Sequence, residues 1–459
     1  MLLNKPLNLA EKNEWLGEWS IPDAFEGKVL GNLKYDGSDV VTLELYIDSR
    51  NSEFTVRKYE VLHGMSGKQE ITLLNVRATA PNLRYFPVRF PYRVSYKVDS
   101  VIIGAHIENR DSEVFSKLHV SIEDTNRWSG ASSISSRIPK SSVEDSKEYG
   151  VFVVKSNPNP IEVDGKIYRV VSENVGVSAK YQKGETFGNV RAQDFWEVSS
   201  PSLFSLDKAL EEVRMLQGLL SFAACRVAGV IWIQLEVAGT EGELPDGTPL
   251  PPRRVNVISS LMGIGQFDLE CVDPRHFLFS CDSIPFEVIL PKWICVYEDI
   301  RVPINMILAQ IFAPMQFIEN TLLMIVGTAE VLHKNLNISR ARSLKERLVD
   351  LASTFIKNAS PLLIPDIPHW ATRTVKARNS LTHEGMADKH SVDELITIIK
   401  VTRAVITLAV MEKLEISGEH QKYVVENNPQ FIEAAMYARD WLTPPPEEIA
   451  EEKQNNTDA

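Results

Sequence analysis

The segment RNSLTH at residues 378–383 combines a permanent cation, an amide and an imidazole within six residues. An imidazole can transfer protons near neutral pH, while a guanidinium keeps its charge and can stabilise an anion. Arg followed directly by Asn and, five residues after the Arg, by His is expected about 0.03 times by chance in a chain of this composition. The segment is therefore a candidate acid–base site, although a His in the last turn of a helix also occurs to complement the helix dipole.

The charge around this segment is opposite in sign to that of the whole chain. The 459 residues carry 49 Lys and Arg against 61 Asp and Glu, a net charge of -12. Residues 334–383 hold 9 basic and 3 acidic side chains, a net charge of +6, which leaves -18 for the rest. A basic field around a candidate acid–base His is expected for a phosphate-rich ligand. The acidic remainder excludes an indiscriminate RNA-coating protein, but not a selective one.

The helix that must carry this segment has clear start and stop signals. Asp366 is predicted to cap its start, Pro368 fits its first turn, and Gly385 can close it. Five residues of an ideal α-helix turn the chain by about 500°, so Arg378 and His383 would lie about 140° apart around the axis. They can serve one substrate if the helix loosens before Gly385, if the Arg side chain wraps around, or if a second subunit completes the site.

Helical periodicity predicts a bundle of about five helices over residues 303–442. Ser343 and Glu346 form a capping-box signature at the start of one of these helices. The stretch 392–414 is apolar on much of its circumference, which predicts a central helix or one that faces a second subunit. Residues 443–459 are predicted to be a disordered acidic tail.

Residues 1–300 are predicted to form a large, mainly antiparallel β-region, so the fold class is α+β. Alternating apolar residues, as at 41–47, with turn signals between the runs are typical of a sandwich or distorted barrel. A helical interlude is predicted near 205–226, strand-like sequence resumes to about Tyr297, and 128–146 is predicted to be a long loop. Without a catalytic constellation, this region is expected to bind, sense or scaffold. Its histidines are scattered along the sequence: His63, His106, His119 and His276.

A helical bundle with RNxxxH at the end of its third helix resembles the HEPN (higher eukaryotes and prokaryotes nucleotide-binding) superfamily. Its pairing with a long β-rich N-terminal region resembles the ApeA-type anti-phage defence proteins. This resemblance implies a metal-independent endoribonuclease without a cofactor. His383 would be the general base or acid when a ribose 2′-OH attacks the adjacent phosphorus, leaving a 2′,3′-cyclic phosphate. Arg378 would stabilise the phosphoryl charge, and Asn379 would orient either the imidazole or the end of the helix.

Further basic residues near the candidate site are predicted to contact RNA phosphates. Arg373 and Lys376 share the helix face of His383, and Arg347 is predicted to extend the track. A solvated helix face is the alternative for Arg373 and Lys376, and an ion pair with Asp350 three residues later is the alternative for Arg347. Glu330 resembles a polar position in the first helix of the superfamily and is predicted to support the RNxxxH residues, with a surface position as the alternative.

The resemblance implies a toxic effector of abortive infection that cuts tRNA or other structured RNA. It also implies a homodimer or higher homo-oligomer and a phage-derived trigger acting at the N-terminal region. Four separated cysteines, no signal peptide and no uninterrupted apolar run predict a cytoplasmic protein without a membrane partner. The rivals are a non-catalytic HEPN nucleotide-binding or protein-interaction module with a β-rich ligand-binding domain, and a glycan-binding sandwich with a helical dimerisation domain.

Overall fold

The chain forms two compact units in a computed structural model. One unit comprises Met1–Leu220 and Ala228–Cys271, and is called the N-terminal unit; the other comprises Ser221–Val227 and Val272–Ala459, and is called the helical unit. Antiparallel strands dominate the first and helices the second, which confirms the predicted α+β class. The structure describes residues 5–22, 27–38, 40–47, 58–79, 92–130, 134–137, 150–153, 159–182, 185–243, 247–260, 262–264, 273–337, 343–355, 360–384 and 389–444.

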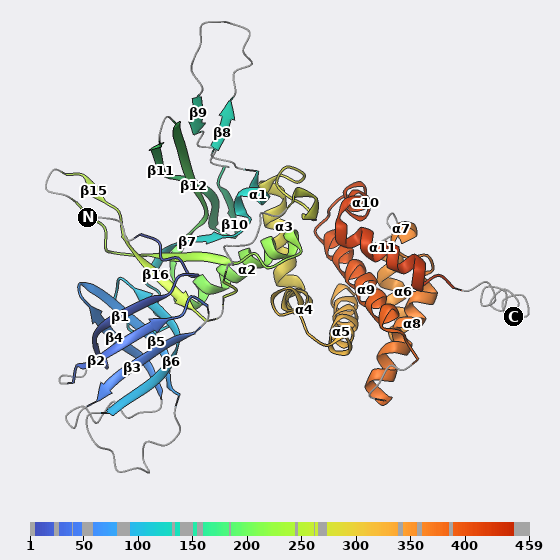
Figure 1. Cartoon of the computed structure of the whole chain (residues 1–459), viewed down its shortest axis with the longest axis horizontal. Coiled ribbons are helices and arrows are strands. Elements are labelled where there is room, and N and C mark those ends of the chain that lie inside the picture. Colours follow the sequence, from blue (N-terminus) through green and yellow to red (C-terminus); the bar gives the residue numbers. More distant parts are fainter. Residues whose placement is uncertain are drawn as a thin grey trace, which may run out of the picture. The chain divides into compact units, whose positions relative to one another are not determined.

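Six antiparallel strands of the N-terminal unit close into a barrel (Figure 1). Their order is β6-β3-β2-β1-β4-β5, and β5 pairs with β6 to complete the ring. Every second residue of β3 is buried, as the alternation at 41–47 predicts. A Cβ on Gly64 would lie 2.3 Å from the Trp19 ring, so only glycine lets this buried indole pack against β4. The strands are β1 (Asn13–Ser20), β2 (Val29–Tyr35), β3 (Val41–Ile47), β4 (Lys58–Ser66), β5 (Gln69–Ala78) and β6 (Tyr92–Ile103).

The same sheet continues beyond β6 through β16, β13, β7, β12, β11 and β10. The predicted helical interlude is α2 (Leu206–Ala224), and the division between the two units falls inside it. Tyr168 of β11 donates a hydrogen bond to Glu212 of α2 at 3.0 Å, which holds the helix against this sheet. The strands of the extension are β7 (Phe115–Ile122), β10 (Ile161–Val163), β11 (Lys166–Gln182), β12 (Glu185–Phe204), β13 (Val230–Val237) and β16 (Arg253–Ser259).

Two predictions for this half of the sequence are wrong. The strand-like sequence predicted to run to Tyr297 is a strand at its start, in β16, but its end is a helix, α3 (Phe286–Asp299). The apolar residues after Pro285 recur at helical spacing, and a short apolar run fits either period. The predicted loop 128–146 contains the end of α1 (Thr125–Ser129) and a strand, β8 (Ile134–Arg137), which pairs with β9 (Gly150–Val153). A second small hairpin pairs β14 (Gly242–Glu243) with β15 (Pro249–Leu250).

The helical unit packs around α9, which contacts α5, α6, α8 and α11 (Figure 1). Buried residues lie on most of the circumference of α9, which confirms the predicted central helix. The capping box of α6 is also confirmed, since Ser343 Oγ accepts from the Glu346 amide at 3.2 Å and Glu346 accepts from the Ser343 amide at 3.1 Å. The helices are α3, α4 (Arg301–Phe312), α5 (Ile318–Leu336), α6 (Leu344–Phe355), α7 (Ser360–Leu363), α8 (Ile367–Asn379), α9 (Val392–Lys413), α10 (Gly418–Asn427) and α11 (Pro429–Trp441).

Some predictions concern residues outside the described ranges. These are the closing role of Gly385, the loop at 138–146, and all but the first two residues of the tail 443–459. Across the part of the chain that is described, no helix combines the length and apolarity needed to cross a bilayer.

Candidate active site

The helix that carries the RNxxxH motif (Arg378, Asn379 and His383) changes its winding inside the motif. α8 begins as predicted, with Asp366 accepting a hydrogen bond from the His369 amide at 2.7 Å. The α-helix ends at Asn379, and Ser380–Glu384 form a π-helical turn. Such single π-turns are rare and occur often at functional sites.

The π-turn reduces the angular separation of Arg378 and His383, which would lie on different sides of an ideal α-helix. Its hydrogen bonds join residue i to residue i+5, so it advances the chain by fewer degrees per residue than an α-helix. The angle between Arg378 and His383 around the axis is therefore smaller than in a continuous α-helix. The structure confirms the first of the three expected features, a helix that loosens at its end, while the wrapped Arg side chain and the second subunit stay predictions.

The motif side chains lie at the surface of the helical unit. Asn379 and His383 are exposed and Arg378 is half-buried, while Leu381 between them is buried and anchors the turn. Nη1 of Arg378 donates to Oδ1 of Asn379 at 3.2 Å, and the Thr382 hydroxyl donates to the Arg378 carbonyl. Within the described ranges, the His383 imidazole makes no hydrogen bond or ion pair, so its nitrogens remain available to a substrate.

A carboxylate from α9 engages the motif helix one turn and a half before Arg378. Glu394 accepts hydrogen bonds from Arg373 of α8 and also lies against His390, whose Nδ1 is 3.1 Å from its Oε2. Only 7% of the Glu394 side chain and 2% of the His390 side chain are exposed. Burial by itself would raise the pKa of Glu394, but the hydrogen bonds and charges of Arg373 and His390 outweigh it and lower that pKa. Glu394 is therefore an anion in the folded protein at neutral pH.

The basic residues predicted to contact phosphate differ in whether they already form ion pairs with carboxylates. Arg373 is paired with Glu394, and Arg347 donates to Glu330 of α5, which also lies 3.2 Å from Lys334. Lys376 is exposed. RNA binding by these residues and support of the motif by Glu330 stay predictions, and Arg373 and Arg347 would bind phosphate only in competition with a carboxylate.

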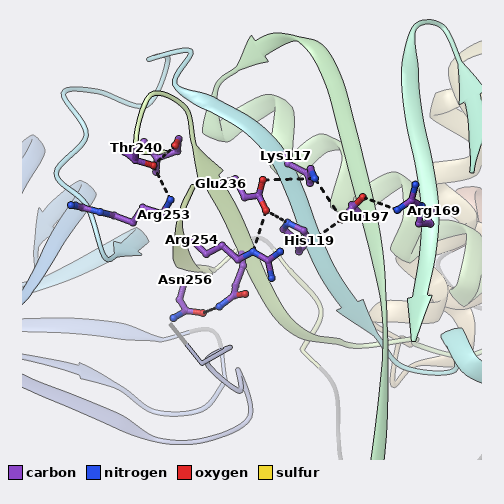
Figure 2. Close-up of polar contacts among 11 residues, drawn as sticks. Lys117, His119, Arg169, Glu197, Glu236, Thr240, Arg253, Arg254 and Asn256 are labelled. Carbon is purple, nitrogen blue, oxygen red and sulfur yellow. Dashed lines mark hydrogen bonds and ion pairs between the residues drawn. The ribbon is translucent and has the colours of Figure 1, made fainter. Parts of the chain in front are cut away.

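The N-terminal unit holds a second group of charged side chains, on one face of the sheet extension (Figure 2). Cross-strand pairing aligns one row of residues on β11, β12, β7, β13 and β16: Arg169, Glu197, His119, Gln234 and Asn256. A neighbouring row lies on β7, β13 and β16: Lys117, Glu236 and Arg254. Histidines that look scattered in the sequence are thus placed in specific settings by the fold; His63 and His106 likewise stack with ring centroids 4.4 Å apart.

His119 is the centre of this charged group. It is fully buried, and its Nε2 lies 2.8 Å from Oε1 of Glu236, which also accepts from Nε of Arg254 at 3.1 Å. Nδ1 lies 3.9 Å from Oε2 of Glu197, beyond hydrogen-bonding distance. Lys117 reaches the same two carboxylates at 3.7 Å and 3.9 Å. Figure 2 shows these side chains converging from β7, β12, β13 and β16.

Burial lowers the pKa of His119, and the nearby Arg254 adds to this, while Glu236 opposes it. For Glu236 burial acts to raise the pKa, but the hydrogen bond with His119 and the charges around it lower it overall. The pair is therefore a neutral imidazole that donates Nε2–H to a carboxylate. Nδ1 is left as an acceptor with no hydrogen-bond partner among the described residues.

A barrel-based β-rich unit followed by a helical bundle with RNxxxH defines a protein of the HEPN class with a separate N-terminal region. Comparison with protein families agrees at both ends of the chain. The family model "ApeA N-terminal domain 1" matches residues 14–293, more than half of the sequence, and "Apea-like HEPN" matches residues 316–420. The chain belongs to the ApeA family and is a HEPN-type defence effector.

HEPN domains are in general nucleases or ribonucleases that bind RNA and often dimerise. No curated protein and no solved structure matches the chain. The family therefore defines the class of the protein, while its reaction, its substrate and the roles of individual residues depend on the chemistry of the site itself.

Sequence reasoning missed Glu394 and His390 as neighbours of the candidate site. The signal was present, because Ser391 to Glu394 reads S-x-x-E, a capping box like that of Ser343 and Glu346. Ser391 does cap α9, accepting from the Glu394 amide at 3.1 Å. The Glu394 carboxylate, however, bonds to Arg373 on another helix, a use that no local pattern predicts.

Proposed function

We propose that this chain is a metal-independent endoribonuclease that cuts tRNA or other structured RNA and acts as the toxic effector of abortive infection. The observation that carries the proposal is the π-turn within the RNxxxH motif, which narrows the angle between a permanent cation and an imidazole that has no bonded partner among the described residues. A phosphodiester bound across this turn would have a proton-transfer group and a charge-stabilising group within reach of the same phosphorus.

In the proposed reaction His383 removes the proton from a ribose 2′-OH or protonates the leaving 5′-oxygen. The 2′-oxygen forms a bond to phosphorus while the bond to the 5′-oxygen breaks, which leaves a 2′,3′-cyclic phosphate and a free 5′-OH. Arg378 stabilises the charge that builds on the non-bridging oxygens. Asn379, bonded to Arg378, holds the guanidinium and the end of α8 in place.

The exposed position of the motif supports a homodimer or higher homo-oligomer in this proposal. An RNA backbone lying on one protomer's turn would remain open to water, whereas two turns placed around a two-fold axis would enclose it. Lys376 is the basic residue best placed to add a phosphate contact, since it is exposed on α8.

In the same proposal the N-terminal unit senses a phage-derived trigger. The charged group around His119 supports this role, because Arg169 and Lys117 keep 40% and 30% of their side chains exposed and their ion pairs are 3.7 Å or longer. Cations held this loosely can exchange a carboxylate for a partner at little cost.

The test is to express the wild type, His383→Ala and Arg378→Ala in cells and to size total RNA. We expect growth arrest and RNA fragments with 2′,3′-cyclic ends from the wild type alone, and cleavage by the purified protein in the presence of a chelator. Equal toxicity with intact RNA for all three proteins would instead favour a non-catalytic HEPN module. Cleavage that disappears with chelator would contradict the metal-independent mechanism.

A further inference from the structure

A buried carboxylate of α9, Glu394, is bonded to α8, the helix that leads to His383. Glu394 sits in the first turn of α9, yet its side chain leaves that turn to accept from Arg373 on α8. It also contacts His390, which lies in the chain between the π-turn and α9. One side chain thus joins the segment before the motif, the segment after it, and the central helix of the unit.

Comparison with the other capping box of this unit shows that this arrangement is not local helix chemistry. In α6 the carboxylate of Glu346 turns back to the amide of Ser343, as the capping box requires. In α9 the equivalent glutamate forms no such bond within the described residues, and its oxygens go to Arg373 and His390 instead. At α9 the glutamate therefore bonds to Arg373 of another helix instead of to the amide at the start of its own helix.

Burial makes this contact costly to rearrange. Only 7% of the Glu394 side chain is exposed, so burial has already removed most of its hydration. If Arg373 moved away, the carboxylate would lose its paired cation without regaining that hydration. His390 is equally enclosed, and its Nδ1 has no aligned hydrogen-bond partner among the residues described, so Glu394 is the charge that faces it. The positions of Arg373 and His390 are therefore fixed relative to one another.

From these contacts we infer that Glu394, with Arg373 and His390, is a positioning group that fixes the π-turn and hence the placement of His383 against Arg378. This inference rests on the proposed nuclease function and changes the expected role of Arg373. Arg373 acts through Glu394 on the geometry of the motif, and does not serve as a phosphate contact. A π-turn held only by its own hydrogen bonds could return to the α-helical winding, and clamping both of its flanks prevents this.

The test compares full-length Glu394→Gln with Glu346→Gln, which removes the same chemical group from the capping box of α6. Hydrogen exchange of the amides of residues 378–384 reports the π-turn directly. We expect about tenfold faster exchange there in Glu394→Gln and no change in Glu346→Gln. His390→Asn, a milder change, should give a smaller increase in the same segment and covers the case in which Glu394→Gln fails to fold.

Cleavage kinetics on bulk tRNA separate positioning from RNA binding. A displaced catalytic geometry lowers kcat by about 10- to 100-fold with KM nearly unchanged. If Arg373 were a phosphate contact instead, Glu394→Gln would free its guanidinium and lower KM, and this result would overturn the inference. Unchanged exchange at 378–384 in both Glu394→Gln and His390→Asn would overturn it as well.

Failure of the nuclease proposal is visible separately. If the wild type cleaves no tRNA, the proposed function falls for that substrate, while the exchange data still decide whether Glu394 fixes the turn. If the wild type cleaves and Glu394→Gln cleaves at the same rate with unchanged exchange, the nuclease proposal survives and the positioning role is lost.

Discussion

His119 in the N-terminal unit and His383 in the helical unit differ in how their surroundings occupy the imidazole. His119 is fully buried, donates to Glu236 and lies among four charged side chains from four strands, Lys117, Glu197, Glu236 and Arg254. His383 is exposed at the end of a helix and has no bonded partner in the described part of the unit. Both rings lie in charged regions of the molecule, and only the second is accessible to a ligand.

The difference shows what distinguishes a structural histidine from one that can act as an acid–base catalyst. Burial lowers the pKa of His119 and keeps the ring neutral, so its proton is used to satisfy Glu236. An acid–base catalyst must instead gain and lose a proton in contact with substrate, which requires open nitrogens. The nearby carboxylates are also used differently: Glu236 accepts a hydrogen bond from the His119 ring itself, whereas Glu394 bonds to the helix that leads to His383.

Replacing His383 is expected to have the largest effect. His383→Ala should reduce RNA cleavage by about 10²- to 10⁴-fold without changing stability, because the side chain is exposed and its loss removes only proton transfer. Initial rates on bulk tRNA and the thermal midpoint measure the two effects. His119→Asn is the matched control, and a larger loss of cleavage in His119→Asn than in His383→Ala would reverse the comparison.

Breaking the buried pair of the N-terminal unit should act on stability. Glu236→Ala removes the acceptor of both His119 and Arg254, and is expected to lower the free energy of unfolding by about 3 to 5 kcal/mol, since buried groups lose their partner. Arg169→Ala is the control on the same face, with a long and partly exposed ion pair, and should cost about 1 kcal/mol or less. Denaturant unfolding of the full chain measures both. Equal losses would show that burial does not distinguish the two contacts.

The pH dependence of the N-terminal unit follows from the lowered pKa of His119. Its ordinary value is about 6.5, and in the folded protein it is lower, so the unfolded chain binds the proton first as pH falls. Stability from this group is full above about pH 6.5 and decreases below it. Glu236, whose pKa is also lowered, adds a further loss as pH falls through about 4.5.

Hydrogen exchange in β7 and β13, followed from pH 8 to pH 5 with correction for intrinsic rates, measures this loss. We expect protection to decrease in the wild type and to depend less on pH in His119→Asn. Protection that rises on acidification would mean that His119 is stabilised in its charged form, contrary to the argument from burial.

The smallest expected effect concerns a local contact at the start of α6, the cap at Ser343. Ser343→Ala removes the N-cap of α6 and should destabilise the helical unit by about 1 kcal/mol, with no change in the rate of RNA cleavage. Thermal unfolding and the cleavage assay check this together. A loss of cleavage comparable to that of Glu394→Gln would mean that any weakening of the bundle disturbs the motif, and would remove the special role of Glu394.

Local patterns predicted the elements that depend on neighbours in sequence. The cap at Asp366, the capping box at Ser343 and the alternation of β3 were all read correctly, because each rests on side chains and amides within a few residues. The stretch from Phe286 to Tyr297 was wrongly predicted as strand, because a short apolar sequence fits both periods and packing decides between them. The RNxxxH residues themselves could be selected from the sequence by residue type and spacing alone.

Only the tertiary structure decided which charged and polar side chains pair with one another. The sequence determined that Arg373 is basic and that Glu394 follows a helix cap; the packing of α8 against α9 made them one ion pair. The same holds for His119 and Glu236, which are 117 residues apart and become neighbours through strand pairing. The π-helical winding at Ser380–Glu384 is another feature that only the tertiary structure decided. Local patterns encode bonds that close within a turn, and bonds across elements exist only once the chain has folded.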